Sequence, residues 1–164
     1  MPCKKSNCGC SSVSEPTISE RLTAMGLTLP EVVPPLASYT PAVCFGHTVY
    51  TSGQLPVADG NFVAVGKVGV DVSTEQAYDC AKQCALNALA AAANLVGLDS
   101  IRDVIKVTGF VNSGLDYDQQ ATVLNGASDF FGELFGRAHA RSAVGVACLP
   151  KNSPVEVEVI FSIK

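Results

Sequence analysis

The segment at positions 154–163 alternates between large apolar side chains and a second set that contains two glutamates. Successive side chains of a β-strand point to opposite faces, so this alternation predicts a strand buried on one side. The face expected to pack on helices carries Val155, Val157, Val159, Phe161 and Ile163. The opposite face carries Glu156, Glu158, Ile160 and Ser162.

The preceding segment, 140–148, also alternates, and it predicts a neighbouring strand. Its larger set is Ser142, Val144, Val146 and Cys148, and its smaller set is Arg141, Ala143, Gly145 and Ala147. We expect the valine-containing set to face the helices and the smaller set to share the open face with Glu156 and Glu158. Alanine and glycine permit the close approach of another backbone, which favours a subunit interface over a solvated face.

Two long helices are predicted. The longer spans Ser73 to Leu95, where Ser73 and Gln76 can form a capping box and a stripe of alanine and cysteine recurs at helical spacing. The second spans Asp116 to Phe135, and a short helix is expected over Thr17–Gly26. The small side chains of the longest helix indicate close packing against a sheet.

The remaining strands are expected at Ala42–Phe45 and Thr48–Ser52, which form a hairpin through Gly46 and His47, and at Ile101–Asn112. Short strand pieces are expected within 53–69. This order predicts an α+β fold with one sheet and two long helices on one face. Residues 17–164 are expected to form a single domain, and residues 1–16 a mobile tail rich in cysteine and serine.

Composition excludes several classes of protein. With 48% hydrophobic and 16% charged residues the chain is not disordered, and with 11 basic against 15 acidic residues it lacks the basic excess of a nucleic-acid binder. No apolar run approaches the roughly 20 residues that span a bilayer, and the N-terminus has no apolar signal region. Seven cysteines without such a signal predict free thiols and a cytoplasmic location.

Other chemical motifs are weak. Cys3, Cys8 and Cys10 could bind a soft metal, but no second Cys or His cluster completes a recognised spacing, so no metal site is predicted. The chain has two histidines and no G-x-S-x-G motif, which argues against a serine-histidine-aspartate triad. His139 is expected either at the rim of a cleft or on the surface.

Arg141 and Glu156 are the candidate reactive pair. A planar guanidinium can bind a carboxylate through two parallel hydrogen bonds, and a glutamate in a partly dry cleft can be poised for proton transfer. The residues alone leave a second interpretation open, in which the two form an intersubunit salt bridge without chemistry.

Three segments carry a family resemblance: T-S-G-Q-L-P at Thr51–Pro56, H-A-R-S-A-V at His139–Val144, and L-P-x-x-x-x-V-E-V-E at Leu149–Glu158. Together they resemble the YjgF/RidA family, also called the reactive-intermediate deaminase or L-PSP endoribonuclease family, over about residues 36 to 164. The resemblance implies a chorismate-mutase-like fold and a homotrimer, in which the sheets form a central barrel and ligand clefts lie between subunits.

The resemblance also implies an activity, the hydrolysis of enamines and imines such as 2-aminoacrylate and 2-iminopropanoate to a 2-keto acid and ammonia. No metal or organic cofactor is implied. Arg141 matches the arginine that binds the substrate carboxylate, and Glu156 matches the glutamate that positions or activates water. Tyr39 and Ser52 match cleft residues. Asn125 resembles a family asparagine, with a solvent-facing helix residue as the alternative.

Two departures separate the chain from the family pattern. The motif R-S-C-V reads R-S-A-V here, and the acidic residue expected two positions after the cysteine is Gly145. Cys148 does not replace the missing thiol, because it lies on the opposite strand face. The chain therefore resembles a divergent branch, for which a non-catalytic module binding small carboxylates or metabolites stays open. An endoribonuclease is the third reading, and the acidic composition counts against it; neither a nucleic acid nor a membrane is expected as a partner.

Overall fold

The structure is a computed structural model that describes residues 15–32 and 38–164. Cys3, Cys8 and Cys10, and with them the predicted tail up to residue 14, lie outside the described residues. Within the described ranges, no helix is long and apolar enough to cross a bilayer.

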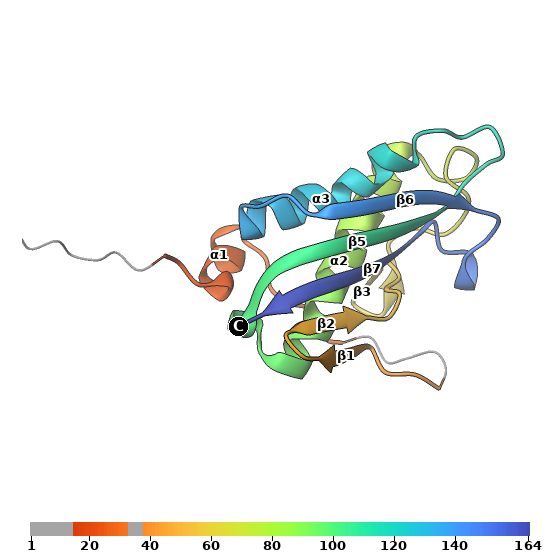
Figure 1. Cartoon of the computed structure of the whole chain (residues 1–164). Helices are drawn as coiled ribbons and strands as arrows, with labels where there is room; N and C mark the ends of the chain where they lie inside the picture. The colour runs from red at the N-terminus through yellow and green to blue at the C-terminus, as the bar shows by residue number, and fades with distance from the viewer. Residues whose placement is uncertain (1–14, 33–37) are drawn as a thin grey trace, which may run out of the picture.

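The main sheet has five strands in the order β1-β2-β7-β5-β6 (Figure 1). Neighbouring strands run antiparallel except for β5 and β6, which are parallel. The strands are β1 Ala42–Phe45, β2 Thr48–Thr51, β5 Ile101–Asn112, β6 Ala140–Val146 and β7 Val155–Ile163. A small second sheet pairs β3 Val57–Ala58 with β4 Asn61–Phe62, which confirms the short strand pieces expected there.

In Figure 1, α2 lies behind the sheet and crosses the strands, and α3 runs beside the β6 edge, where it contacts β5, β6 and α2. Helix α2 spans Thr74–Val96, and Ser73 and Gln76 form the predicted capping box. Helix α3 spans Gln120–Phe135 and begins four residues later than expected, because the Gln120 side chain donates to the Tyr117 carbonyl and holds a turn there. The remaining helical elements are α1 Ile18–Ala24, η1 Leu98–Ser100 and η2 Pro150–Asn152.

The core lies between the sheet and these helices. Val155, Val157, Val159 and Phe161 of β7 are buried on the helix side, which confirms the alternation predicted for this strand. The alanines of α2 allow α3 to approach closely: a Cβ at Gly126 would overlap the carbonyl oxygen of Tyr78. A glycine is therefore required where the two helices cross.

The face predicted for β6 was wrong. Arg141 pairs with Val107 and Gly145 pairs with Val111, and both of these β5 valines are buried on the helix side. Arg141, Ala143 and Gly145 therefore face α3, and Val144 lies on the open face. The physical reason is that α3 supplies the bulk here. Its Leu124 side chain fills the space above Gly109 of β5, so the sheet beneath α3 carries small residues.

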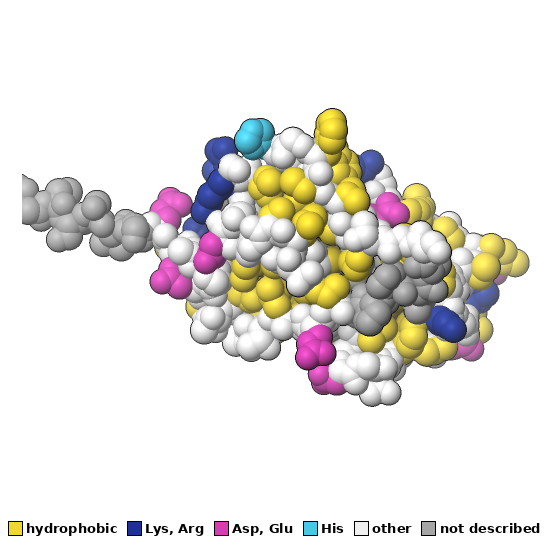
Figure 2. Space-filling view, turned by 90° about the horizontal axis from the view of Figure 1, so that it is seen from below, with side chains coloured by type: hydrophobic (Ala, Val, Ile, Leu, Met, Phe, Trp, Pro, Cys, Tyr) yellow, Lys and Arg dark blue, Asp and Glu magenta, His cyan; other side chains and the backbone are white. Residues whose placement is uncertain are grey.

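The open face of the sheet carries exposed apolar side chains. Phe45 is 81% exposed, and Val43, Tyr50 and Val144 are also exposed. Strand register places all four opposite the helix-covered side. Figure 2 views the molecule from below, toward the edge of the sheet that β1 forms, and hydrophobic side chains gather in the middle of that view. Apolar surface of this kind typically marks a contact with another molecule.

Candidate active site

Arg141 extends from β6, the edge strand, over α3. Its Nη1 donates to Oδ1 of Asn125 at 2.8 Å and to Oγ of Ser128 at 3.2 Å. Asn125 and Ser128 are three residues apart and so lie on the same side of the helix. The structure therefore brings Asn125 to Arg141. Both described hydrogen bonds use Nη1, which leaves Nη2 and Nε for a bound carboxylate.

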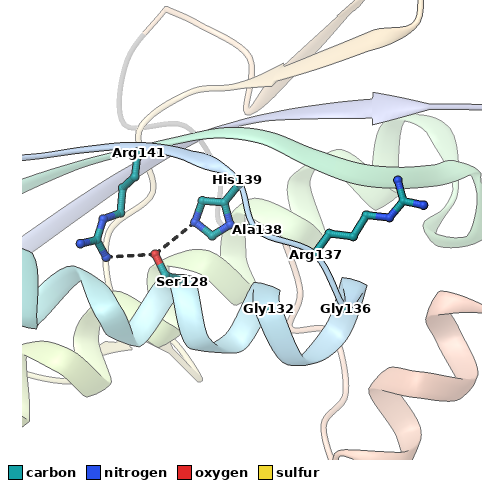
Figure 3. Close-up of a pocket in the computed structure, with 7 residues that line it drawn as sticks. All are labelled: Ser128, Gly132, Gly136, Arg137, Ala138, His139 and Arg141. Carbon is teal, nitrogen blue, oxygen red and sulfur yellow. Dashed lines mark hydrogen bonds between the residues drawn. The ribbon is translucent and has the colours of Figure 1, made fainter.

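His139 lies directly before β6 and contacts Ser128, which also binds Arg141. Its Nε2 lies 3.1 Å from the hydroxyl oxygen of Ser128, and the dashed lines of Figure 3 trace the contacts from Arg141 through Ser128 to His139. A shallow pocket of about 490 Å³ lies beside these three side chains. Arg137 also lines the pocket, but Figure 3 shows it pointing away from Arg141, and it pairs with Asp103 at 3.3 Å.

The imidazole of His139 is half-buried, and this burial lowers its pKa below the ordinary histidine value. The nearby positive charge of Arg141 lowers the pKa further, and Asp103 acts weakly in the opposite direction. The ring is therefore held in its neutral form next to the guanidinium. We refer below to Arg141, Asn125, Ser128 and His139 as the arginine group.

Glu156 lies on the other face of the sheet, half-buried against the segment that follows β2. A Cβ at Gly53 would overlap the Glu156 carboxylate, so the glycine leaves the space that this carboxylate occupies. Gln54 holds the segment in place by exchanging two backbone hydrogen bonds with Val157. Burial raises the pKa of Glu156, and the negative charge of Glu158 adds to this effect. A carboxylate with a raised pKa is a stronger base.

Ser52 directly precedes Gly53, and its hydrogen bonds reach the segment that follows Tyr39. The Ser52 hydroxyl donates to the carbonyl of Thr40 at 2.6 Å, and the Ser52 amide donates to the carbonyl of Pro41 at 2.9 Å. These bonds fix the segment that carries Tyr39, whose side chain is exposed. Glu156, Gly53, Ser52 and Tyr39 are called the glutamate group below.

A single chain does not bring the two groups together. Arg141 faces the helices and Glu156 faces away from them, and β5 separates the strands that carry them. The expectation that both would share the open face on adjacent strands was wrong. The arginine group can bind a carboxylate and the glutamate group can exchange a proton, but one subunit presents them on different sides.

Sequence reasoning did not identify Ser128 and Gly53 as site residues. The spacing of Asn125 and Ser128 on one helix face could have indicated Ser128, and a glycine within a strand pattern could have indicated a close approach at Gly53. The structure also accounts for Gly145. A Cβ there would lie 3.0 Å from Nε2 of Gln120, so Gln120 occupies the space where a longer side chain would begin.

Among the described residues, no cluster of three or more His, Cys, Asp and Glu side chains could hold a metal ion. The buried thiols of Cys80 and Cys84 have pKa values raised by burial, for Cys80 to about 11. Both are therefore protonated at neutral pH and chemically quiet.

Comparisons with known proteins point to one family. The family model described as Endoribonuclease L-PSP matches residues 30–163. Protein TCP17 of Trypanosoma cruzi is 36% identical over 158 residues, which cover 93% of this chain and 98% of that protein. The 2-iminobutanoate/2-iminopropanoate deaminase of Escherichia coli (strain K12) is 34% identical over 125 residues, covering 76% of this chain and 87% of that protein.

Solved structures agree with these sequence matches. The protein Atu1372, with unknown function, from Agrobacterium tumefaciens superposes with a TM-score of 0.81 at 40% identity, covering 90% of this chain and 94% of that one. Escherichia coli TdcF with bound serine superposes with a TM-score of 0.57 at 29% identity, covering 82% and 92%. The matched range 30–163 contains every residue of the arginine and glutamate groups.

Proposed function

We propose that this chain, which belongs to the endoribonuclease L-PSP (YjgF) family, is a cofactor-independent deaminase. The sequence motifs and the predicted α+β fold had indicated the same family. It hydrolyses reactive enamines and imines to a 2-keto acid and ammonia. The observation that carries this proposal is the Arg141 guanidinium, held by Asn125 and Ser128 through Nη1 alone. The likeness to a 2-iminobutanoate/2-iminopropanoate deaminase supports the choice of substrate class.

In the proposed reaction the substrate carboxylate binds Nη2 and Nε of Arg141. Water adds to the carbon of the protonated imine while Glu156 accepts one of the water protons, which forms a neutral carbinolamine. Glu156 returns this proton to the amine nitrogen. As the carbon–nitrogen bond breaks, Glu156 takes up the proton of the carbinolamine hydroxyl and passes it to the departing ammonia, so that the products are the keto acid and ammonium. Glu156 is suited to both steps because its raised pKa brings it closer to neutrality than an ordinary glutamate.

The opposite placement of the two groups leads us to propose a homotrimer. The arginine group of one subunit and the glutamate group of the next form one cleft, and the open sheet faces meet at the centre. The exposed Val43, Phe45, Tyr50 and Val144 support this arrangement, because burying apolar area drives association. The proposed location is the cytoplasm.

The direct test is to generate 2-aminoacrylate in place with a serine dehydratase and follow its decay in the presence and absence of this protein. We expect faster formation of pyruvate and ammonia, with 2-iminobutanoate and longer imino acids run in parallel. An Arg141→Ala variant is the control, because it shows how much of the decay comes from protein groups outside the proposed site. No acceleration with any of these imino acids would contradict the proposal.

One observation favours a second candidate, a trimer that binds small carboxylates without catalysis. Ala143 and Gly145 replace the cysteine and acidic residue of the family motif, and Gln120 occupies the space above Gly145. TdcF was solved with bound serine, a small molecule that carries a carboxylate. The two candidates differ in ammonia release: a binder would retain carboxylate affinity through Arg141 and leave the imine decay rate unchanged.

A further inference from the structure

We propose that His139 is a positioning residue, which orients the Arg141 guanidinium through the hydroxyl of Ser128. This inference rests on the proposed function, in which Arg141 binds the substrate carboxylate. Arg141 lies on the helix-facing side of β6, His139 lies just before β6, and Ser128 lies on α3. The three side chains form a continuous row in Figure 3.

The hydrogen bond between Arg141 and Ser128 can run in only one direction, and the direction of the bond between Ser128 and His139 is assigned as part of the proposal. A guanidinium can only donate, so Nη1 of Arg141 donates to Oγ of Ser128 at 3.2 Å. The serine hydroxyl hydrogen is then available for Nε2 of His139 at 3.1 Å. This assignment makes His139 neutral with its proton on Nδ1. A hydroxyl that donates becomes a better acceptor, so His139 strengthens the hold of Ser128 on Arg141.

An imidazole is an unfavourable choice for packing alone at this position. Nδ1 of His139 is buried and has no hydrogen-bond partner among the described residues. The ring packs edge-on against Phe131, with centroids 6.2 Å apart and planes at 88°. A phenylalanine could make the same contact without a buried unpaired nitrogen, which is costly. The contact that phenylalanine could not make is the one from Nε2 to Ser128.

The surroundings keep the imidazole in the form that this role needs. Arg141 on β6 and Arg137 beside the pocket are positively charged, and Asp103 on β5 is the negative charge acting on the ring. The α3 side chains against the ring, Ser128 and Phe131, carry no charge. Burial and Arg141 outweigh Asp103, so the pKa of His139 is lowered. At neutral pH one ring nitrogen therefore has a free lone pair, and the proposed tautomer places it on Nε2, toward the serine hydroxyl.

The first test determines the direction of the hydrogen bond between Ser128 and His139 and does not depend on activity. Nitrogen-15 NMR of the full chain at pH 7 distinguishes the two neutral histidine tautomers, and a His139→Gln variant identifies the resonances. We expect the tautomer with the proton on Nδ1, and a changed Nε2 shift in Ser128→Ala. A proton on Nε2, or a charged imidazole at pH 7, would overturn the proposal.

The second test measures the consequence for Arg141 with 2-oxobutanoate as the carboxylate probe. We expect His139→Phe and Ser128→Ala each to weaken binding roughly 3- to 10-fold, the worth of one hydrogen bond, and the double variant to be no weaker than either. His139→Gln, which restores a polar group within reach of Ser128, should recover most of the affinity. His47→Phe, at the exposed turn between β1 and β2, is the matched control.

Turnover separates this proposal from the proposed function. With an imine substrate, His139→Phe should raise KM and leave kcat unchanged, because a carboxylate anchor binds ground state and transition state alike. Probe binding with the expected coupling but no ammonia release by the wild type would refute the deaminase and keep the positioning role. If the wild type releases ammonia but the affinity losses of His139→Phe and Ser128→Ala are additive, or His139→Gln binds no better than His139→Phe, the positioning role is refuted and the deaminase is kept. A wild type that neither binds the probe nor releases ammonia would refute both.

Discussion

Arg141 and Glu156 project from opposite faces of one sheet, with β5 between the strands that carry them. A substrate whose carboxylate binds Arg141 therefore lies on the helix-covered side of the sheet, whereas Glu156 of the same subunit lies on the open side. The proposed site is completed only when a second subunit brings its glutamate group to the β6 edge of the first. In this proposal, activity depends on the oligomeric state.

The assembly prediction concerns Val144, which lies on the open face and is exposed. Val144→Arg should dissociate the trimer, because it places an unpaired charge in an apolar contact. Light scattering and sedimentation should then report a monomer, and imine turnover should be lost with it. Leu95→Arg, at the exposed end of α2, should leave the trimer intact. A monomeric wild type would refute the intersubunit cleft.

The anchor prediction concerns Arg141→Lys, which keeps the charge and loses the planar pair of donors. We expect kcat/KM to fall by a factor that corresponds to about 1.5–3 kcal/mol, the range for hydrogen bonds to charged groups. Arg102→Lys, at an exposed position of β5, is the control and should retain full activity. Full activity of Arg141→Lys would remove this residue from the site.

The base prediction concerns Glu156→Gln, which keeps the shape of the side chain and removes its proton acceptor. Turnover should fall by roughly 10²- to 10⁴-fold, the usual contribution of a general base, and 2-oxobutanoate should still bind. Glu158→Gln, two residues along the same face, is the matched comparison: it removes only the contribution of its charge to the pKa of Glu156 and should lower turnover far less than Glu156→Gln. If binding is lost while the trimer persists, Glu156 holds the substrate and does not activate water.

The same substitution has a predicted effect on stability. Because the pKa of Glu156 is raised on folding, the folded state binds more protons than the unfolded state between the ordinary glutamate pKa and the raised value. The free energy of unfolding therefore falls as pH rises through this window. Glu156→Gln should be more stable than wild type at pH 7, and this gain should shrink at pH 4. Denaturant unfolding at fixed protein concentration measures both; a Gln variant less stable at pH 7 would contradict the shift.

The last prediction concerns the close approach of Gly53 to Glu156. Gly53→Ala should cost at most about 1.5 kcal/mol of stability, the order of one displaced rotamer, because the added methyl group overlaps only the flexible end of the Glu156 side chain. It should also lower turnover by displacing Glu156. Gly132→Ala is the control: its Cβ would meet open space on α3, so it should stabilise the helix by roughly 0.5–1 kcal/mol. Equal melting temperatures for the two variants would refute the predicted overlap.

Several features followed from the sequence because they depend on neighbouring residues alone. The alternation from Val155 to Ile163 placed the glutamates opposite the core, and Ser73 and Gln76 marked the start of α2. The motif residues Arg141 and Glu156 were also found this way, because the family resemblance lies in short contiguous segments.

The face of β6 was decided only in the tertiary structure. Its alternation is between small and medium-sized residues, and either set can face a helix, depending on how much volume the helix supplies. Leu124 of α3 supplies that volume, so Arg141 turns toward α3 and Val144 toward the open face. The row from Arg141 through Ser128 to His139 likewise depends on where α3 ends and how the chain enters β6. Local periodicity fixes which side chains share a face, but only the packing of distant elements fixes which face is buried and which side chains meet.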